Sequence, residues 1–217
     1  MKGTAMTEFL IDAPHDPFAL LVLAHGAGAP MDSGFMAAMA ARLAARGVAV
    51  ARFEFPYMAR RRAEGSKRPP DRMPVLLPAF SAAAQEAQAR FPGLPLAIGG
   101  KSMGGRAAAM AAPEISPKAV VCLGYPFHAA GKAETPPERL APLLAPPCPA
   151  LLIQGERDAL GSAADVAALT LPPAVRIVWI ADGDHSLKPR KSAEITAEEA
   201  LDAAAQAAAT FLSEATR

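Results

Sequence analysis

The sequence has few cysteines, few aromatic residues and almost no net charge. Its 217 residues include two cysteines, and 6% of the residues are aromatic. Cys122 and Cys148 lie in or beside apolar runs, which predicts reduced thiols in the core of a cytoplasmic protein and not a disulfide framework. The formal net charge of +1 provides no general attraction to nucleic acid or to an anionic membrane, so we expect neither as a partner.

Metal-binding patterns and long apolar segments are also missing. The four histidines form no H-x-x-x-H pair and the cysteines form no C-x-x-C pair, so we expect no metal and no cofactor. No stretch reaches the roughly 18 uninterrupted apolar residues that a membrane span requires. The apolar segment 18–24 is short and follows Asp16 and Pro17 instead of a basic region, which argues against a targeting signal.

The sequence does have a regular alternation of apolar runs and helical segments. With 52% hydrophobic residues, its length predicts a single globular domain over residues 1–217. The predicted strands are Thr7–Asp12, Leu20–Ala24, Val48–Phe53, Leu94–Gly99, Ala119–Leu123, Ala150–Gln154 and Arg176–Ala181. The predicted helices are Ser33–Arg46, Val75–Phe91, Gly105–Ala112 and Ala193–Glu214. This alternation predicts an α/β fold with a doubly wound, mostly parallel sheet.

The most informative segment is Gly100-Lys101-Ser102-Met103-Gly104, which stands between a predicted strand and a predicted helix. A G-x-S-x-G sequence in this context is typical of a nucleophile elbow, a strained turn that exposes the serine hydroxyl. Glycines are needed beside the serine because a Cβ there would strike the neighbouring backbone. The helix N-terminus also directs free N–H groups toward an anion that forms next to the serine. The segment therefore predicts Ser102 as a nucleophile.

The same segment also matches the end of a phosphate-binding P-loop, G-x-x-x-x-G-K-[ST]. The first glycine of that motif would stand at position 95, which is Pro95. The intervening residues 96–99 suit a strand, and the next predicted strand does not end in a magnesium-binding aspartate. The P-loop interpretation is therefore disfavoured.

An acid and a histidine follow two later strands. Asp158 comes after the strand that begins at Ala150, and His185 comes after the last predicted strand. Since the carboxyl ends of parallel strands meet at one edge of a sheet, Ser102, Asp158 and His185 are expected to meet there. His185 would act as the general base for the serine, and Asp158 would hold the imidazole in the useful tautomer. The spacing thus predicts a catalytic triad.

Three other acidic residues compete with Asp158 for the acid position, namely Glu156, Asp182 and Asp184. Asp158 is preferred because it lies beyond the strand end, where a turn lets it reach the histidine. Asp184 is adjacent to His185, so in an extended segment it points elsewhere.

A loop of sequence H-G-A-G begins at His25, directly after a predicted strand. Hydrolases need a second backbone N–H for the oxyanion, usually from such a loop, so the backbone N–H groups of Ala27 and Met103 are the predicted oxyanion hole. A dinucleotide fingerprint does not fit, because Met31 occupies its third glycine position. We expect His25 to be a structural hydrogen-bonding residue beneath the loop.

These motifs resemble the α/β-hydrolases, and among them the small lidless relatives of dienelactone hydrolase. Segments 25–28, 52–58, 100–106 and 184–185 resemble the branch that contains the testis-expressed hydrolase-like proteins and their bacterial relatives. The resemblance covers nearly the whole chain. It implies an α/β-hydrolase fold without a cap domain and a catalytic triad, but no substrate. Dienelactone hydrolase itself uses a cysteine nucleophile where this chain has Ser102, so its substrate is not carried over.

Two long connections bear on substrate choice. The first, Tyr57–Arg72, carries mostly basic side chains; we favour a solvated, mobile loop, and the alternative is a basic mouth that attracts an anionic substrate or a nucleic acid. The second, Tyr125–Pro147, is rich in proline and has room for at most a short helix around 139–144. It is too short for a large cap, which predicts a shallow, open site for short, soluble substrates.

Two side chains near the predicted site have alternative roles. Lys101 either pairs with Glu54, which we favour, or recognises an acidic group on the substrate. Tyr57 either forms a wall of the substrate pocket or packs in the core. The predicted function is a serine hydrolase that cleaves carboxylic esters or thioesters of small soluble molecules through an acyl-enzyme. The alternative is a catalytically idle hydrolase-like scaffold that binds protein partners.

Overall fold

The computed structural model describes residues 7–132 and 134–217, and within them seven strands form one sheet. The strands lie in the order β1-β3-β2-β4-β5-β6-β7, and neighbours are parallel except for β1 and β3. The strands are β1 (Phe9–Asp12), β2 (Ala19–Ala24), β3 (Val48–Phe53), β4 (Leu96–Lys101), β5 (Ala119–Leu123), β6 (Ala150–Gly155) and β7 (Val175–Ile180). The predicted doubly wound, mostly parallel sheet is confirmed. Residues 1–6 and 133 of the predicted domain lie outside the described part.

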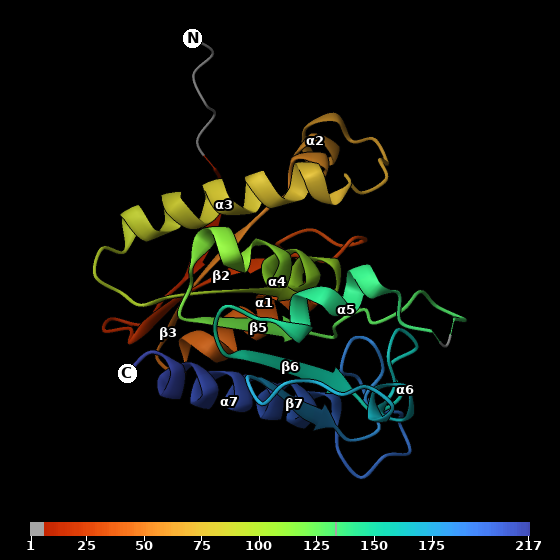
Figure 1. Cartoon of the computed structure of the whole chain (residues 1–217). Coiled ribbons are helices and arrows are strands. Elements are labelled where there is room, and N and C mark those ends of the chain that lie inside the picture. The colour runs from red at the N-terminus through yellow and green to blue at the C-terminus, as the bar shows by residue number, and fades with distance from the viewer. Residues whose placement is uncertain (1–6, 133) are drawn as a thin grey trace.

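Helices cover both faces of the sheet (Figure 1). α3 and α4 pack on one face, and α1 and α7 pack on the other. The helices are α1 (Gly34–Ala44), α2 (Pro56–Glu64), α3 (Met73–Arg90), α4 (Met103–Ile115), α5 (Pro137–Leu144), α6 (Ala163–Ala167) and α7 (Ala197–Ala215). Among the described residues, no helix is long and apolar enough to cross a membrane. The same residues form no separate cap domain, in agreement with the prediction.

Strand β2 shows how the sequence builds this layered core. All of its residues are buried. Leu20, Val22 and Ala24 belong to the core on the α3 and α4 side, whereas Leu21 and Leu23 belong to the core on the α1 and α7 side. Successive side chains of a strand point to opposite faces, so an uninterrupted apolar run serves both cores at once.

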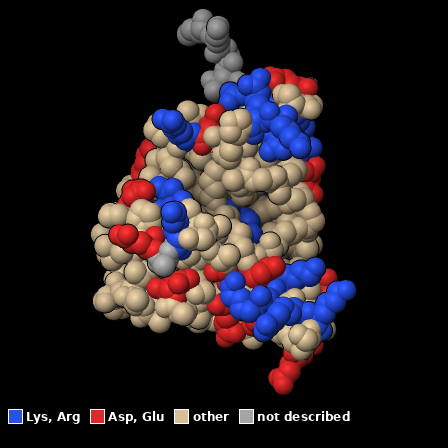
Figure 2. Space-filling view, turned by 90° about the vertical axis from the view of Figure 1, so that its right-hand side faces the viewer, with Lys and Arg blue, Asp and Glu red and all other residues tan. Residues whose placement is uncertain are grey.

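The order of the strands reverses between β2 and β4. β3 pairs with one edge of β2 and β4 pairs with the other, and Ala24 at the end of β2 lies opposite Gly100 near the end of β4. In open α/β sheets such a reversal leaves a crevice at the carboxyl ends of the strands, where ligands bind. Figure 2 looks toward this edge of the sheet, and the molecular surface there is hollowed.

The first long connection differs from the prediction of a mobile loop, because it begins with helix α2. Pro56 stands in the first turn of this helix, and Gly65 ends it in the left-handed conformation with φ 66°. Proline at a helix start and glycine just past its end are the usual boundary signals. Several of the basic side chains are paired with acids, in the pairs Arg60–Asp71, Arg62–Glu54, Arg62–Asp32 and Arg68–Glu64.

Helix α4 continues two residues beyond the predicted stop at Pro113. Pro113 lacks an N–H, so the last turn loses one hydrogen bond, and the helix tolerates that loss near its end. Ser116 then ends the helix in the left-handed conformation, with φ 54°. Helix α7 begins later than predicted because Thr196 and Glu199 form a capping box that fixes its first turn. The short helix expected around 139–144 is α5.

Candidate active site

Ser102 stands in a sharp turn between β4 and α4. Its backbone angles are φ 52° and ψ −115°, a conformation that side-chain-bearing residues rarely adopt. The backbone of the turn is held from both sides, since Ser102 N donates to Leu123 O at 3.0 Å and Arg106 N donates to Ser102 O at 3.1 Å. The geometry is that of the predicted nucleophile elbow.

The two glycines of the elbow are required by close backbone contacts. A Cβ on Gly100 would lie 2.4 Å from the carbonyl carbon of Gly104. A Cβ on Gly104 would lie 2.5 Å from His25 O and 2.6 Å from Ala24 O. These distances are far below a van der Waals contact, so α4 reaches the ends of β2 and β4 only because both positions lack a side chain.

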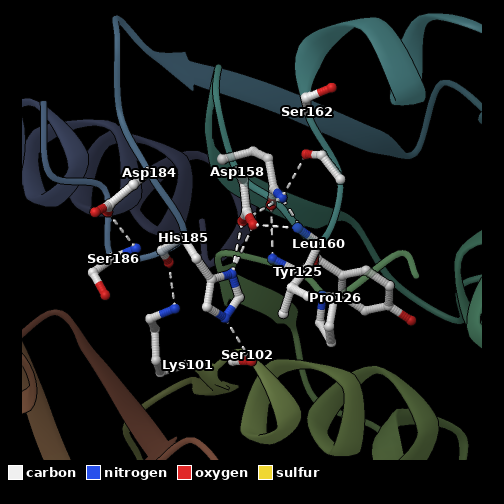
Figure 3. A network of polar contacts seen from close by, with 12 residues as sticks. Lys101, Ser102, Tyr125, Pro126, Asp158, Leu160, Ser162, Asp184, His185 and Ser186 are labelled. Atoms are coloured by element: carbon white, nitrogen blue, oxygen red, sulfur yellow. Dashed lines mark hydrogen bonds and ion pairs between the residues drawn. The ribbon is translucent and has the colours of Figure 1, made fainter. Parts of the chain in front are cut away.

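Ser102, His185 and Asp158 lie in one hydrogen-bonded line (Figure 3). His185 Nε2 is 2.8 Å from Ser102 Oγ, and His185 Nδ1 is 2.8 Å from Asp158 Oδ2. Since the carboxylate can only accept, Nδ1 carries a proton and Nε2 is free to accept the proton of the serine hydroxyl. The Asp158 side chain is fully buried, whereas 29% of the His185 side chain is exposed.

Gln154, which the sequence interpretation did not single out, holds Asp158. The fully buried amide donates from Nε2 to Asp158 Oδ2 at 2.9 Å, and its Oε1 accepts from Tyr125 N at 2.7 Å. Leu160 N donates to Asp158 Oδ1 at 2.8 Å. The carboxylate is therefore oriented by donors other than the imidazole. A polar glutamine within the otherwise apolar strand β6 is the sequence signal that could have identified it.

The three other candidates for the acid of the triad bind groups other than the His185 imidazole. Glu156 accepts from Asp182 N, and Asp182 forms ion pairs with Arg157 and Arg190. Hydrogen bonding from Arg190 lowers the pKa of Asp182 to about 2. Asp184 accepts from the backbone N–H groups that follow it in its own loop. Among these acids, the structure brings only Asp158 to His185.

The loop after β2 is supported from below by two buried side chains. His25 donates from Nδ1 to Gly26 O at 2.6 Å and accepts from Phe55 N at Nε2, and burial lowers its pKa, which favours this neutral tautomer. The Tyr57 hydroxyl donates to Ala27 O at 2.9 Å. Tyr57 is 1% exposed, so it packs beneath the loop and is not the pocket wall that was one of its alternatives. His25 has the structural position that was expected.

The two predicted oxyanion donors lie on either side of Ser102. Ala27 belongs to the loop after β2, and Met103 is the first residue of α4. Within the described residues, the backbone N–H groups of Ala27 and Met103 make no hydrogen bond to another backbone carbonyl. Both N–H groups therefore remain available to an acceptor beside the serine.

Lys101 does not pair with Glu54, so that prediction is wrong. Its ammonium donates to His185 O at 2.5 Å, while Glu54 pairs with Arg62. The placement of the two residues explains the difference. Strand β4 brings Lys101 next to the loop of His185, whereas Glu54 lies directly before helix α2, which carries Arg62. Burial lowers the pKa of Lys101 to about 8.

Ser102 and His185 open onto an apolar cleft of about 370 Å³, which we call the His185 cleft. Lys101 also lines it, so the second alternative for this lysine, contact with a substrate, is sterically open. The remaining lining residues are Gly26, Ala27, Gly28, Ala29, Ser33, Phe35, Met36 and Ser186.

A further cleft, of about 230 Å³, is also lined by Ser102 but not by His185, and we call it the Arg106 cleft. It is lined by Met73, Ser102, Met103, Arg106, Pro126, His128, Ala129, Arg139 and Leu160. Its basic side chains were not singled out from the sequence, because Arg106 and Arg139 are far apart in the chain.

The described residues contain no group of three or more His, Cys, Asp or Glu side chains that could hold a metal ion. Cys122 and Cys148 are free, and Cys122 is buried while Cys148 is half-buried. Burial raises the pKa of both thiols, so neither has the features of a reactive thiolate.

Many solved structures share the fold, and the following are three of them. A ferulic-acid-bound Est1E from Butyrivibrio proteoclasticus is 17% identical, with a TM-score of 0.71 and coverage of 96% of this chain and 94% of that chain. A serine hydrolase without a lid from Xanthomonas campestris is 19% identical, with a TM-score of 0.68 and coverage of 97% and 95%. A dienelactone hydrolase from Anabaena variabilis is 21% identical, with a TM-score of 0.68 and coverage of 98% and 93%.

Among curated proteins, none matches the chain. The family model that describes an alpha/beta hydrolase domain matches residues 17–213, which is most of the chain. The predicted family resemblance is therefore confirmed, and the fold neighbours include lidless and dienelactone hydrolase members. The chain belongs to the α/β-hydrolase family.

Proposed function

We propose that this protein is a serine hydrolase that cleaves carboxylic esters or thioesters of small molecules through an acyl-enzyme. The observation that carries the proposal is the hydrogen-bonded line from Ser102 through His185 to Asp158. A hydroxyl next to the free nitrogen of an imidazole, with a carboxylate behind the ring, is the arrangement that activates a serine for attack on a carbonyl.

In the first half of the reaction, Ser102 Oγ attacks the carbonyl carbon and its proton passes to His185 Nε2. The negative charge on the carbonyl oxygen is stabilised by the N–H groups of Ala27 and Met103. The bond to the leaving group then breaks, and His185 returns the proton to the departing oxygen or sulfur. Asp158 remains ionised and stabilises the imidazolium.

In the second half, a water molecule attacks the acyl-enzyme. His185 takes a proton from the water and gives it to Ser102 Oγ as the acyl group leaves as a carboxylic acid. Each proton is returned within the cycle, so the triad ends in its starting state. Ser102 and His185, which exchange these protons, are joined by a hydrogen bond.

The openness of the site favours short substrates. No cap domain is formed by the described residues, and the His185 cleft has a volume of about 370 Å³. A small, uncapped site of this kind suits small esters or thioesters more than long lipids.

A p-nitrophenyl ester series of increasing chain length, measured on the wild type and on Ser102→Ala, tests the proposal. We expect turnover of short esters by the wild type and loss of at least about a thousandfold in kcat in the variant. Labelling by a fluorophosphonate probe provides a second measurement, since it requires an activated serine. A wild-type protein that is neither labelled nor active would support the idle, partner-binding scaffold instead.

A further inference from the structure

The Arg106 cleft contains two arginines, Arg106 and Arg139, that form no ion pair within the described residues. Arg106 Nε is buried without a hydrogen-bond partner, and Arg139 Nη1 donates only to the backbone oxygen of Pro126. No acidic residue lines the cleft. The third basic group there, His128, faces Asp165.

Asp165 is not free to balance the arginines. It accepts from the backbone and the hydroxyl of Ser162 in the capping box of α6, in addition to its contact with His128. The arginines of the first long connection are different, because Arg60 and Arg62 each face a carboxylate. On the face at the strand ends, Figure 2 shows basic side chains next to acidic ones at the rim of the hollow.

The position of His185 assigns the two sides of the serine to the two parts of an ester. The departing oxygen must receive its proton from His185 Nε2, so the leaving group has to lie beside that ring. His185 lines the His185 cleft and is absent from the lining of the Arg106 cleft. The leaving group therefore fits the former, and the acyl group fits the latter.

We propose that the Arg106 cleft binds a carboxylate at the far end of the acyl group, so that the preferred substrates are half-esters or half-thioesters of short dicarboxylic acids. This inference rests on the proposed serine hydrolase activity. A guanidinium presents parallel N–H donors that match the two oxygens of a carboxylate, and an unneutralised charge in a cleft gains most from an anionic ligand. The volume of about 230 Å³ suits a short acyl chain.

The test compares p-nitrophenyl hydrogen adipate with methyl p-nitrophenyl adipate, which has nearly the same acyl length but no terminal charge. For the wild type we expect kcat/KM to favour the charged ester by about tenfold or more. The Arg106→Gln variant is expected to lower this ratio toward one. The Arg139→Gln variant lowers it in the same direction, and it serves as the measurement if Arg106→Gln does not fold.

The matched control is Arg60→Gln, which removes an exposed arginine that is paired with Asp71 at the surface. The ratio is expected to stay at its wild-type value in this variant. A ratio near one in the wild type, or a ratio that Arg60→Gln lowers as much as Arg106→Gln does, would overturn the inference and leave the serine hydrolase intact.

A second pair of substrates tests which side of the serine carries the charge. 4-Acetoxybenzoate has a charged leaving group, and methyl 4-acetoxybenzoate has an uncharged leaving group of nearly the same size. A preference for the charged member of this pair alone would contradict the assignment of the Arg106 cleft to the acyl group. Stronger inhibition by inorganic phosphate than by adipate would contradict the proposal that the Arg106 cleft binds a carboxylate. Absence of turnover of all four esters, together with absence of fluorophosphonate labelling, would instead overturn the proposed function and with it this inference.

Discussion

The two halves of the candidate site are held in place by different means. The half that contains Ser102 is fixed by backbone, through a strained turn and through contacts that leave no room for a Cβ at Gly100 or Gly104. The half that contains His185 is fixed by side chains, through Asp158 and Gln154. A backbone-held group tolerates little change, whereas a side-chain-held group can be weakened one hydrogen bond at a time.

Lys101 joins the two halves. It ends strand β4, directly before Ser102, and its ammonium donates to the backbone oxygen of His185. Variants of the site are therefore of three kinds. Some break a side-chain contact of the triad, some add a Cβ where two backbone segments touch, and some remove the contact of Lys101 that links the two halves.

The largest expected effect comes from breaking the side-chain half at Asp158. In Asp158→Asn the amide can orient the imidazole in the wrong tautomer, and we expect kcat for ester hydrolysis to fall about a thousandfold or more. That fall corresponds to about 4 kcal/mol of transition-state stabilisation. Asp184→Asn is the control, because the Asp184 side chain accepts from the backbone N–H groups of Ser186 and Lys188 in its own loop. Similar losses in the two variants would contradict the assignment of the acid.

The next largest effect is expected when a Cβ is added at Gly104, in the half of the site that the backbone holds. In Gly104→Ala the new Cβ would lie 2.5 Å from His25 O, and strands in the core cannot shift far enough to relieve it. We expect the free energy of unfolding to fall by about 3 kcal/mol or more, measured by denaturant titration. Gly34→Ala is the control, since a Cβ there meets nothing within 4 Å. A Gly104→Ala protein of wild-type stability would show that the elbow is not held by backbone contact.

The link between the halves is tested by pH. Burial lowers the pKa of Lys101 from 10.5 to about 8, so between these values the native protein binds fewer protons than the unfolded chain. Stability conferred by such a group rises with pH, and the wild type should gain about 3 kcal/mol relative to Lys101→Met as the pH is raised from 8 to 10.5. Thermal or denaturant unfolding of both proteins measures the difference, which is expected to be constant below pH 7. A difference that stays constant up to pH 10.5 would contradict the burial of a charged lysine.

The smallest effect on kcat is expected for Gln154→Leu, which removes one donor to Asp158 and the bonds to Tyr125 and Gly161 but leaves the His185 contact in place. We expect kcat to fall about tenfold with little change in KM, because the carboxylate is less well oriented. The rate of fluorophosphonate labelling should fall in parallel. Gln88→Leu is the control, since Gln88 donates to backbone oxygens at the end of α3. Equal effects of the two variants on kcat would show that Gln154 acts only through stability.

The parts of the site that depend on short stretches of sequence were predictable. The elbow at Ser102 requires glycines at fixed offsets, and the segment shows them within five residues. The order of serine, acid and histidine follows from the placement of strands, which long apolar runs reveal. His25 was expected to be a structural hydrogen-bonding residue beneath the loop, and it holds Gly26 and Phe55 there.

Predictions that depended on which side chain meets which were less successful. Lys101 ends strand β4 and Glu54 directly follows strand β3, yet Glu54 pairs with Arg62 of helix α2 and not with Lys101. The basic connection Tyr57–Arg72 was expected to be a mobile loop. Instead, Pro56 and Gly65 mark the ends of helix α2, and its arginines form ion pairs, such as Arg60 with Asp71. Charge counts alone do not reveal pairing, since partners 8 to 30 residues apart meet only after the chain turns.

The amino-acid sequence was enough to predict a mostly parallel sheet, a serine elbow at its edge and Asp158 as the preferred acid, because periodicity, glycine offsets and strand ends are local properties. Only the packed fold shows that Gln154 supports Asp158, and that Arg106 and Arg139 line one cleft without an acidic residue. Those facts depend on distances between residues far apart in the chain, and such distances are fixed only when the elements pack together.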